Sequence, residues 1–485
     1  MKPSRRQILI GMTIGGASLF LPRLPAGLFS RPEAVEVNGL AEEFRRASRE
    51  GALPIAAGAM AAGADTTTLL AAVFMAGITE IRPRSVGQKL HALMMVSSTF
   101  ELAQISSPEE ARLAVLWNLD DVKRSQARDV REGDWHLPPR PVVSFASEEK
   151  ARREFFDAMS AWDDQRADSA LVGLLPFHNH VSFFEILWPM VMSSYVDLGH
   201  KVIFGVQVER VLRRIGWQYA EPVLRSLIYG LLYVEAGERK TESFERSLSR
   251  LPDLPAKPWQ GKEDPSQSAS ILGQLRQASA NKAQDLVMAA LAAGIGPATL
   301  WDGLRLYAAE LFHRRPRSAL RRHGPVHPVT EVNAFAYIWR TSNNDQTKAL
   351  ALLQAAAWLP LLRDDLITFF GEPEGATIDT LGLSPDSPAL DDVFQKPSPA
   401  RAHRFLHEAE NIAPFLTRMR HCLFHKATQD HQYKFTAALH EEAGLIHPSL
   451  CARFLAPAVT YLPNGTDPDT DVLHRSQEAL ARFKL

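Results

Sequence analysis

The stretch DLGHKVIFGVQVE, residues 197–209, contains the repeat that decides the fold. His200, Phe204 and Val208 follow one another every four residues, and Val211 continues the row. This spacing places them on one face of an α-helix, which turns once every 3.6 residues. The stretch therefore predicts a helix whose buried apolar face also carries a histidine.

The same helical repeat extends over most of the remaining chain, whereas alternating strand patterns are scarce. We expect an all-α fold, with a single large multi-helix catalytic domain over residues 31–485 and long irregular loops. The expected helices cover residues 38–50, 66–77, 86–104, 108–128, 147–162, 168–176, 180–195, 198–214, 217–235, 268–293, 297–313, 327–342, 345–363, 400–425, 430–443 and 447–457.

Single residues also predict helix starts and loops. Ser147 and Asp345 are expected to cap helices, because their side-chain oxygens can accept hydrogen bonds from the first amide groups. Pro328 suits the first turn of a helix, where its missing N–H would have no partner. Proline-rich or polar sequence predicts loops at residues 133–143, 236–267 and 371–399.

The composition is that of a packed globular protein. The chain has 485 residues, of which 46% are hydrophobic and 22% charged. Its net charge of −1 gives no electrostatic reason to expect nucleic acid or an anionic membrane as a partner. Two cysteines, Cys422 and Cys451, cannot form a disulfide scaffold or a four-thiolate metal site. They can form one bridge or stay reduced in the core.

Residues 1–30 have the pattern of a twin-arginine export signal. Ser4, Arg5 and Arg6 precede a short apolar run over residues 8–21. The pattern predicts a periplasmic or otherwise exported protein, which uses the twin-arginine export machinery and meets the membrane only transiently through its signal. The alternatives are a chance Arg-Arg pair before an apolar helix and a retained N-terminal anchor.

Four histidines lie at or beside the apolar faces of four expected helices, namely His91, His200, His327 and His431. The sequence has no Walker A motif, nucleophile elbow or H-E-x-x-H motif. Facing helices of a bundle can bring side chains together, and imidazole is a common ligand of iron, copper and zinc. The alternative for each residue is a core histidine that is hydrogen-bonded to a carbonyl group.

Other histidines are competing candidates. Two of them precede an apolar helix, as capping or loop residues do, and four form pairs at i,i+4 spacing, which can chelate a metal or arise by chance. In chain order these are His178, His180, His403, His407, His421 and His425. His425 is the best reserve ligand, because it lies near His431 in the sequence.

Lys434 follows His431 by three residues, so both lie on one helix face beside the apolar row. A lysine in this position usually extends its ammonium group to water. In a dry site its amine becomes neutral, and a neutral amine can take up carbon dioxide to form a carbamate. Four imidazoles with such an anion would suit a redox-active metal better than magnesium or calcium.

Four segments resemble the questin oxidase-like family. They are KLHALMMVSS at 89–98, GHKVIFGVQVE at 199–209, HPVTEVNA at 327–334 and QDHQYKFTAAL at 429–439. In an iron-dependent branch of this family, four histidines and a carboxylated lysine bind the metal. The resemblance implies that the ligands are His91, His200, His327, His431 and Lys434.

The resemblance implies an enzyme, a mononuclear Fe(II) oxygenase that uses dioxygen to oxidise an aromatic or polycyclic organic substrate. Thr330, Asn333 and Tyr337 are candidate catalytic or substrate-contacting residues, because they lie on the helix that His327 opens; ordinary helix packing is the alternative. Two other functions stay open. One is a metal-dependent hydrolase with copper or zinc, and the other is an exported helical binding protein without a catalytic metal.

Overall fold

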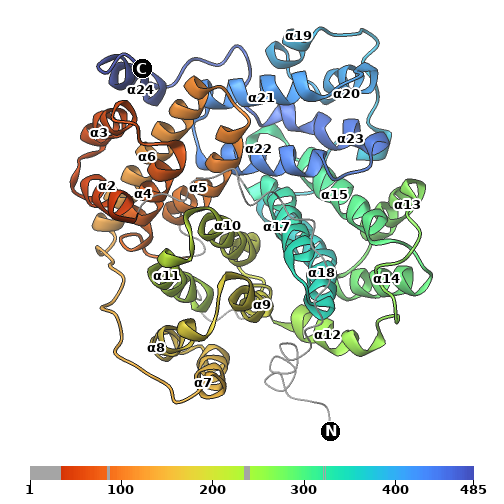
Figure 1. Ribbon diagram of the computed structural model, residues 1–485. Helices are drawn as coiled ribbons and strands as arrows, with labels where there is room; N and C mark the ends of the chain where they lie inside the picture. Colours follow the sequence, from red (N-terminus) through yellow and green to blue (C-terminus); the bar gives the residue numbers. More distant parts are fainter. Residues whose placement is uncertain (1–33, 85–87, 234–240, 321, 323) are drawn as a thin grey trace. The chain divides into compact units, whose positions relative to one another are not determined.

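The computed structural model describes residues 34–84, 88–233, 241–320, 322 and 324–485 (Figure 1). In these ranges the chain is almost wholly helical or irregular, and its β-contact is one isolated bridge between Lys262 and Ile295. The predicted all-α multi-helix fold with long irregular loops is confirmed. The predicted export signal, residues 1–30, lies outside the described residues. No helix in the described part of the chain combines the length and apolar character of a membrane span.

The chain forms two compact units. Unit 1 holds the chain up to residue 239 together with residues 342–347 and 471–485, and unit 2 holds residues 240–341 and 348–470. Neither unit is therefore a continuous segment. That residues 31–485 form one catalytic domain stays a prediction.

Unit 1 is built around helices that are buried on nearly every side. The central helices α4 and α10 pack against α5, and the C-terminal helix α24 packs against α3 and α6, near the start of the chain (Figure 1). The helices are α2 (Ala34–Arg46), α3 (Arg49–Ala61), α4 (Thr66–Ile78), α5 (Gln88–Gln104), α6 (Pro108–Arg131), α7 (Glu148–Ala161), α8 (Asp164–Leu174), α9 (His180–Val191), α10 (His200–Ile215), α11 (Ala220–Leu232) and α24 (Asp471–Ala481).

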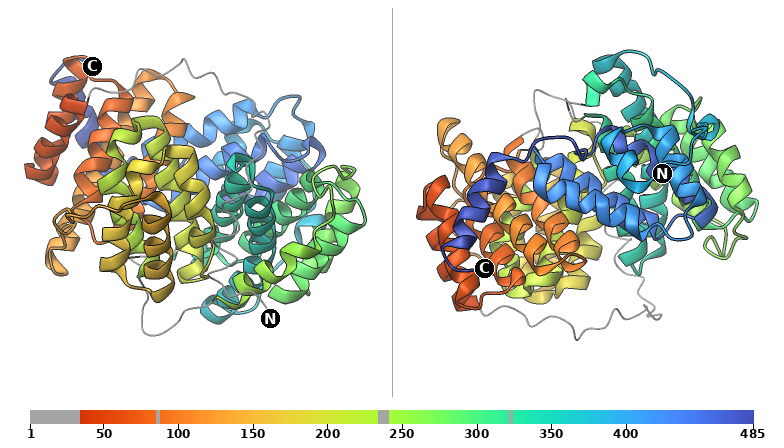
Figure 2. Two further views of the ribbon diagram at one scale, coloured as in Figure 1. Left: turned by 60° about the horizontal axis from the view of Figure 1, so that its bottom comes forward. Right: turned by 90° about the horizontal axis from the view of Figure 1, so that it is seen from above.

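Unit 2 has a similar core, in which α17 packs against both α15 and α22 (Figure 2). Helix α18 joins this core, since its Trp358 meets Phe335 of α17 with ring centroids 5.0 Å apart. The helices are α12 (Glu242–Arg250), α13 (Pro265–Leu275), α14 (Ala280–Ala292), α15 (Pro297–His313), α16 (Arg317–Leu320), α17 (His327–Thr341), α18 (Asp345–Phe370, whose first turn belongs to unit 1), α19 (Leu390–Gln395), α20 (Pro399–Glu408), α21 (Ala413–Lys426), α22 (Asp430–Ala443) and α23 (Pro448–Leu455).

Two expected helices are each divided in the structure, so these predictions were wrong. The expected helix at 268–293 becomes α13 and α14, because the Ser279 side chain accepts a hydrogen bond from Lys282 N and caps a new helix. The expected helix at 400–425 becomes α20 and α21, and Asn411 accepts from Ala413 N at the break. The apolar repeat continues across both breaks, so periodicity alone did not reveal them.

Five of the described helices were missed, namely α3, α12, α16, α19 and α24, and α19 lies inside the expected loop 371–399. Helix α12 lies inside the expected loop 236–267, where Phe244 and Leu248 supply a buried face one turn apart. Helix α3 is rich in alanine and glycine and contains Pro54. Small residues give little contrast between apolar and polar faces, so the helical repeat is weak there.

The predicted helix starts agree in part with the structure. Ser147 caps α7 by accepting from Lys150 N, and Pro328 lies in the first turn of α17, as expected. The cap at Asp345 was wrong, because the Asn344 side chain accepts from the amide groups of residues 346 and 347 instead. Asp345 is already the first residue of α18.

The two cysteines are buried free thiols rather than a disulfide. Burial raises the pKa of the Cys451 thiol to about 11 and also raises that of Cys422. Both side chains therefore act as small core residues and are poor nucleophiles.

A buried ion pair joins α8 to α11 in unit 1. Arg225 donates to both carboxylate oxygens of Asp168 at 2.6 and 2.9 Å, and it also donates to the carbonyl of Pro138 at 2.8 Å. Both charged side chains are at most 4% exposed. The pair therefore holds the proline-rich segment 133–143 against the helices.

We predict that Asp168→Asn destabilises the protein by about 3–5 kcal/mol, because it leaves the Arg225 charge buried without its partner. Urea unfolding followed by circular dichroism measures this loss. The control is Glu154→Gln, which breaks the exposed pair of Glu154 with Arg166 in the same unit and should leave the midpoint nearly unchanged. Equal midpoints for Asp168→Asn and wild type would contradict the prediction.

Candidate metal centre

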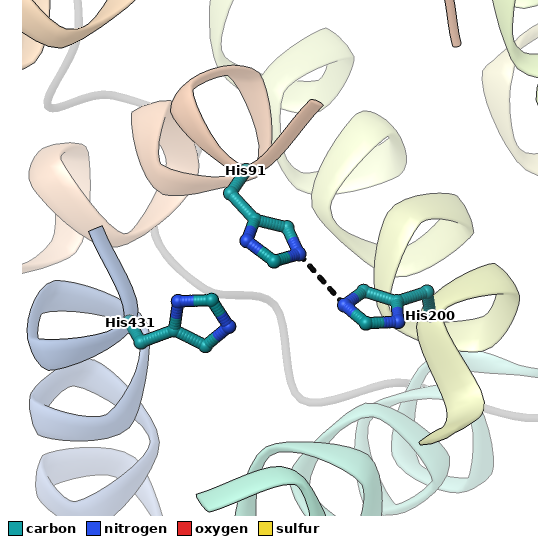
Figure 3. A group of neighbouring side chains, drawn as sticks. All are labelled: His91, His200 and His431. Atoms are coloured by element: carbon teal, nitrogen blue, oxygen red, sulfur yellow. Dashed lines mark hydrogen bonds between the residues drawn. The ribbon is translucent and has the colours of Figure 1, made fainter. Parts of the chain in front are cut away.

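Two of the predicted ligands meet inside unit 1. His91 on α5 and His200 on α10 are 4% and 6% exposed. Their rings are nearly parallel, with centroids 4.8 Å apart. The two Nε2 atoms face one another at 2.7 Å (Figure 3). This contact joins residues that are 109 positions apart in the sequence.

The backbone before α10 determines how His200 is oriented. Leu198 and Gly199 have positive φ angles of 54° and 82°, so the chain makes a left-handed turn immediately before the helix. His200 then begins α10, and its Nδ1 donates to the carbonyl of Asp197. Since Nδ1 carries the proton, the lone pair of neutral His200 is on Nε2, the atom that faces His91.

The other two predicted histidine ligands meet inside unit 2. His327 begins α17 and His431 lies in the first turn of α22, and they are 3% and 5% exposed. Their ring centroids are 5.4 Å apart at an angle of 79°. Nδ1 of His431 lies 2.6 Å from Oδ1 of Asp430. The carboxylate favours a proton on Nδ1, which leaves the Nε2 lone pair available to a metal.

The ring separation within each pair agrees with that of two histidines that bind one metal ion. Metal–nitrogen bonds are about 2.0–2.1 Å long. Two imidazole centroids therefore lie about 4.5 Å apart if the two bonds make a right angle at the metal, and about 5.2 Å apart if they make the tetrahedral angle. The observed separations of 4.8 and 5.4 Å lie close to this range. The Nε2 atoms of His91 and His200 are slightly closer than the about 2.9 Å expected at a right angle. The same contact also suits one shared proton.

Lys434 is buried with the histidine pair of unit 2. It follows His431 by one helical turn on α22 and is 4% exposed. The amine is therefore held inside the protein rather than extended into bulk water.

Three of the four histidines are the first or second residue of a helix, namely His200 in α10, His327 in α17 and His431 in α22, and His91 is the fourth residue of α5. The N-terminal end of a helix carries a partial positive charge and favours anions. A metal ion bound at such positions needs negative charge nearby. Asp430 supplies one charge, and a carbamate on Lys434 would supply another.

The three candidate substrate contacts have different surroundings. The Thr330 hydroxyl donates to the carbonyl of His327 at 3.2 Å, within its own helix. Tyr337 is 8% exposed, and the Arg340 guanidinium lies 5.9 Å from its ring centroid. Asn333 is treated separately below, because it joins two helices. That these residues contact substrate stays a prediction.

Asn333 joins α17 to α22. Its amide donates to Glu441 at 2.7 Å and to Glu442 at 2.6 Å, and Arg305 of α15 donates to Glu442 at 2.5 Å. These bonds hold together the two helices that carry His327 and His431. Asn333 therefore positions the histidine pair of unit 2, a role that the sequence alone did not suggest.

Glu331 is an unusual carboxyl group in unit 2. It lies one turn after His327, is 1% exposed, and its two oxygens have no hydrogen-bond partner among the described residues. Burial raises its pKa well above the ordinary value of 4.5, and the charge of Asp365 adds to the effect. The carboxyl group of Glu331 therefore keeps its proton to a higher pH than an ordinary glutamate does.

Sequence reasoning gave no role to Asp430 or Glu331. An acidic residue directly before His431 and another one turn after His327 were the available signals. Two of the competing histidines lie near carboxylates. Nε2 of His178 is 3.3 Å from Glu148, and Nε2 of His180 is 2.9 Å from Glu209. Neither histidine belongs to a group of three or more potential metal ligands among the described residues.

The chain has no match among the known proteins with which it was compared. No family model, curated protein or solved structure matches this chain. The resemblance to the questin oxidase-like family therefore stays a prediction, which rests on the four segments around the histidines.

We predict that Glu331→Gln stabilises the metal-free protein at pH 7. The unfolded chain releases this proton near pH 4.5, whereas the folded chain keeps it to a higher pH, so the carboxyl group lowers the free energy of unfolding as the pH rises above 4.5. The gain from glutamine should therefore shrink as the pH falls toward 4.5. Urea unfolding at several pH values measures it.

Glu442→Gln is the matched control for this experiment. Glu442 is equally buried, but it accepts from Arg305 and Asn333, so losing its charge should destabilise the protein at pH 7. Destabilisation by both variants at pH 7 would contradict the assignment of a neutral Glu331.

Proposed function

We propose that this protein is a metal-dependent oxidoreductase, an oxygenase that acts with iron on an aromatic or polycyclic organic substrate. The observation that carries the proposal is the presence of two pairs of buried imidazoles, one in each unit, with ring separations suited to one ion. Desolvating an imidazole costs free energy, which a bound ion would offset.

The proposed ligands are His91 and His200 from unit 1 with His327, His431 and Lys434 from unit 2. Each pair is defined within its own unit, so the binding of one ion by both pairs belongs to the proposal. Four imidazole ligands make magnesium and calcium poor fits, since both ions favour oxygen ligands. Iron, copper and zinc all accept imidazole.

Lys434 completes the proposed ligand set as a carbamate. Its neutral amine adds to carbon dioxide, a C–N bond forms, and the nitrogen releases a proton to solvent. The side chain thereby changes from a potential cation to an anion with oxygen ligands. This anion offsets the metal charge at positions where three helix N-termini oppose it.

The bound ion would supply the one-electron redox chemistry that activation of dioxygen requires. The chain itself orients the ligands. Asp430 and the Asp197 carbonyl keep protons on the Nδ1 atoms of His431 and His200. Glu331, neutral and one turn from His327, is a candidate proton donor. Apolar neighbours such as Phe435, which is 1% exposed, exclude water from this part of α22.

Metal identity separates the oxygenase from the alternative function. A hydrolase would hold zinc or copper and work without dioxygen, whereas the proposed oxygenase would hold iron and lose activity under anaerobic conditions. The proposal also includes export by the twin-arginine route, since the first 30 residues have that pattern.

We predict that His200→Ala and Lys434→Ala each remove the metal from the purified full-length protein, whereas wild type holds about one ion per chain. Lys434→Glu should retain part of the metal, because its carboxylate replaces the carbamate oxygens. Asp430→Asn should weaken metal binding by about 10–100-fold. Elemental analysis and chelator competition measure these effects.

The control is His403→Ala, which removes a buried histidine whose Nδ1 donates to the carbonyl of Leu381. This variant should keep the metal of wild type. Equal metal content in wild type, His200→Ala and Lys434→Ala would show that the ligand assignment is wrong.

A further inference from the structure

A third pair of histidines lies on α21, outside the proposed centre. His421 and His425 are one helical turn apart, and their ring centroids are 4.2 Å apart at an angle of 41°. Both side chains are partly exposed. This separation is close to the about 4.5 Å expected for two imidazoles bound to one ion at a right angle.

The hydrogen bonding of His425 suits a metal ligand. Its Nδ1 donates to the carbonyl of His421 at 2.8 Å. Because Nδ1 carries the proton, the lone pair of the neutral ring is on Nε2. A carbonyl that accepts from one ring nitrogen while the other binds the ion is the usual environment of a histidine ligand.

The position in the helix also favours a cation. Helix α21 ends at Lys426, so His425 lies in its last turn and His421 one turn before. The C-terminal end of a helix carries a partial negative charge. This is the reverse of the situation of His200, His327 and His431, which lie at helix N-termini.

The chain contains an internal comparison at the same spacing. His403 and His407 of α20 are also four residues apart, but their ring centroids are 6.2 Å apart at 65°. His403 is buried, whereas His407 is exposed. Two rings 6.2 Å apart could share an ion only in a nearly linear arrangement, which a single helical turn disfavours. Spacing alone therefore does not make a chelating pair; ring geometry does.

We propose that His421 and His425 form a second metal site, which binds a zinc-, copper- or nickel-class divalent cation. Two imidazole nitrogens favour these ions over magnesium or calcium. The remaining coordination positions are left to water or small anions, so the site is open and its ion exchangeable. Protons compete with the ion for both rings, so affinity falls as the pH is lowered. This inference does not rest on the proposed oxygenase function.

The test is isothermal titration of as-purified full-length protein with Zn²⁺. Wild type should bind one more Zn²⁺ per chain than His421→Ala or His425→Ala, and the metal already present after purification should not change. The glutamine variants His421→Gln and His425→Gln keep the size and polarity of the side chain, and they should show the same loss.

The control variants are His403→Ala and His407→Ala, which should bind Zn²⁺ as wild type does. Thermal unfolding by circular dichroism verifies that each variant is folded. As a second measurement, Zn²⁺ should protect His425 of the wild type from acylation by diethylpyrocarbonate, detected by mass spectrometry. Equal Zn²⁺ binding by wild type and the His421 and His425 variants, or an equal loss in the control variants, would overturn the proposal.

Discussion

The structure depends on helices that are buried on nearly every side. Helices such as α10, α17 and α22 bring every side chain of a turn into the core, including charged and polar ones. A buried polar group costs free energy unless it has a partner, so most such groups meet a partner, often on another helix. This constraint explains why ion pairs, carboxylate–amide contacts and imidazole pairs lie at the contacts between helices.

The buried groups fall into two kinds. In one kind the charges are matched, as in Arg225 with Asp168 or Arg305 with Glu442, and these contacts hold helices together. In the other kind the partners are alike, as in His91 with His200, and nothing in such a pair neutralises an added charge. Pairs of the second kind contribute little to stability, but they offer two lone pairs to one ion. Metal binding would therefore stabilise the protein where its own contacts do not.

Helix ends give the two proposed metal sites opposite electrostatics. His200, His327 and His431 of the first proposed site lie at helix N-termini, where a cation is disfavoured unless carboxylates compensate for it. This makes the first site demanding in its ligands. His421 and His425 lie toward the C-terminal end of α21, where a cation needs no such compensation. The first site is suited to retaining one ion, and the second is suited to exchanging ions with solvent.

The sequence by itself determined the helical class, because the 3.6-residue repeat is a local property. The expected helices 297–313 and 430–443 end at the same residues as α15 and α22. The sequence also identified the four histidines, from their places on apolar faces. Periodicity shows which face of a helix is buried but not which helix covers it. Only the tertiary structure therefore paired His91 with His200 and His327 with His431. It also left the carboxyl oxygens of Glu331 without a hydrogen-bond partner. Finally, it brought the rings of His421 and His425 close together but not those of His403 and His407.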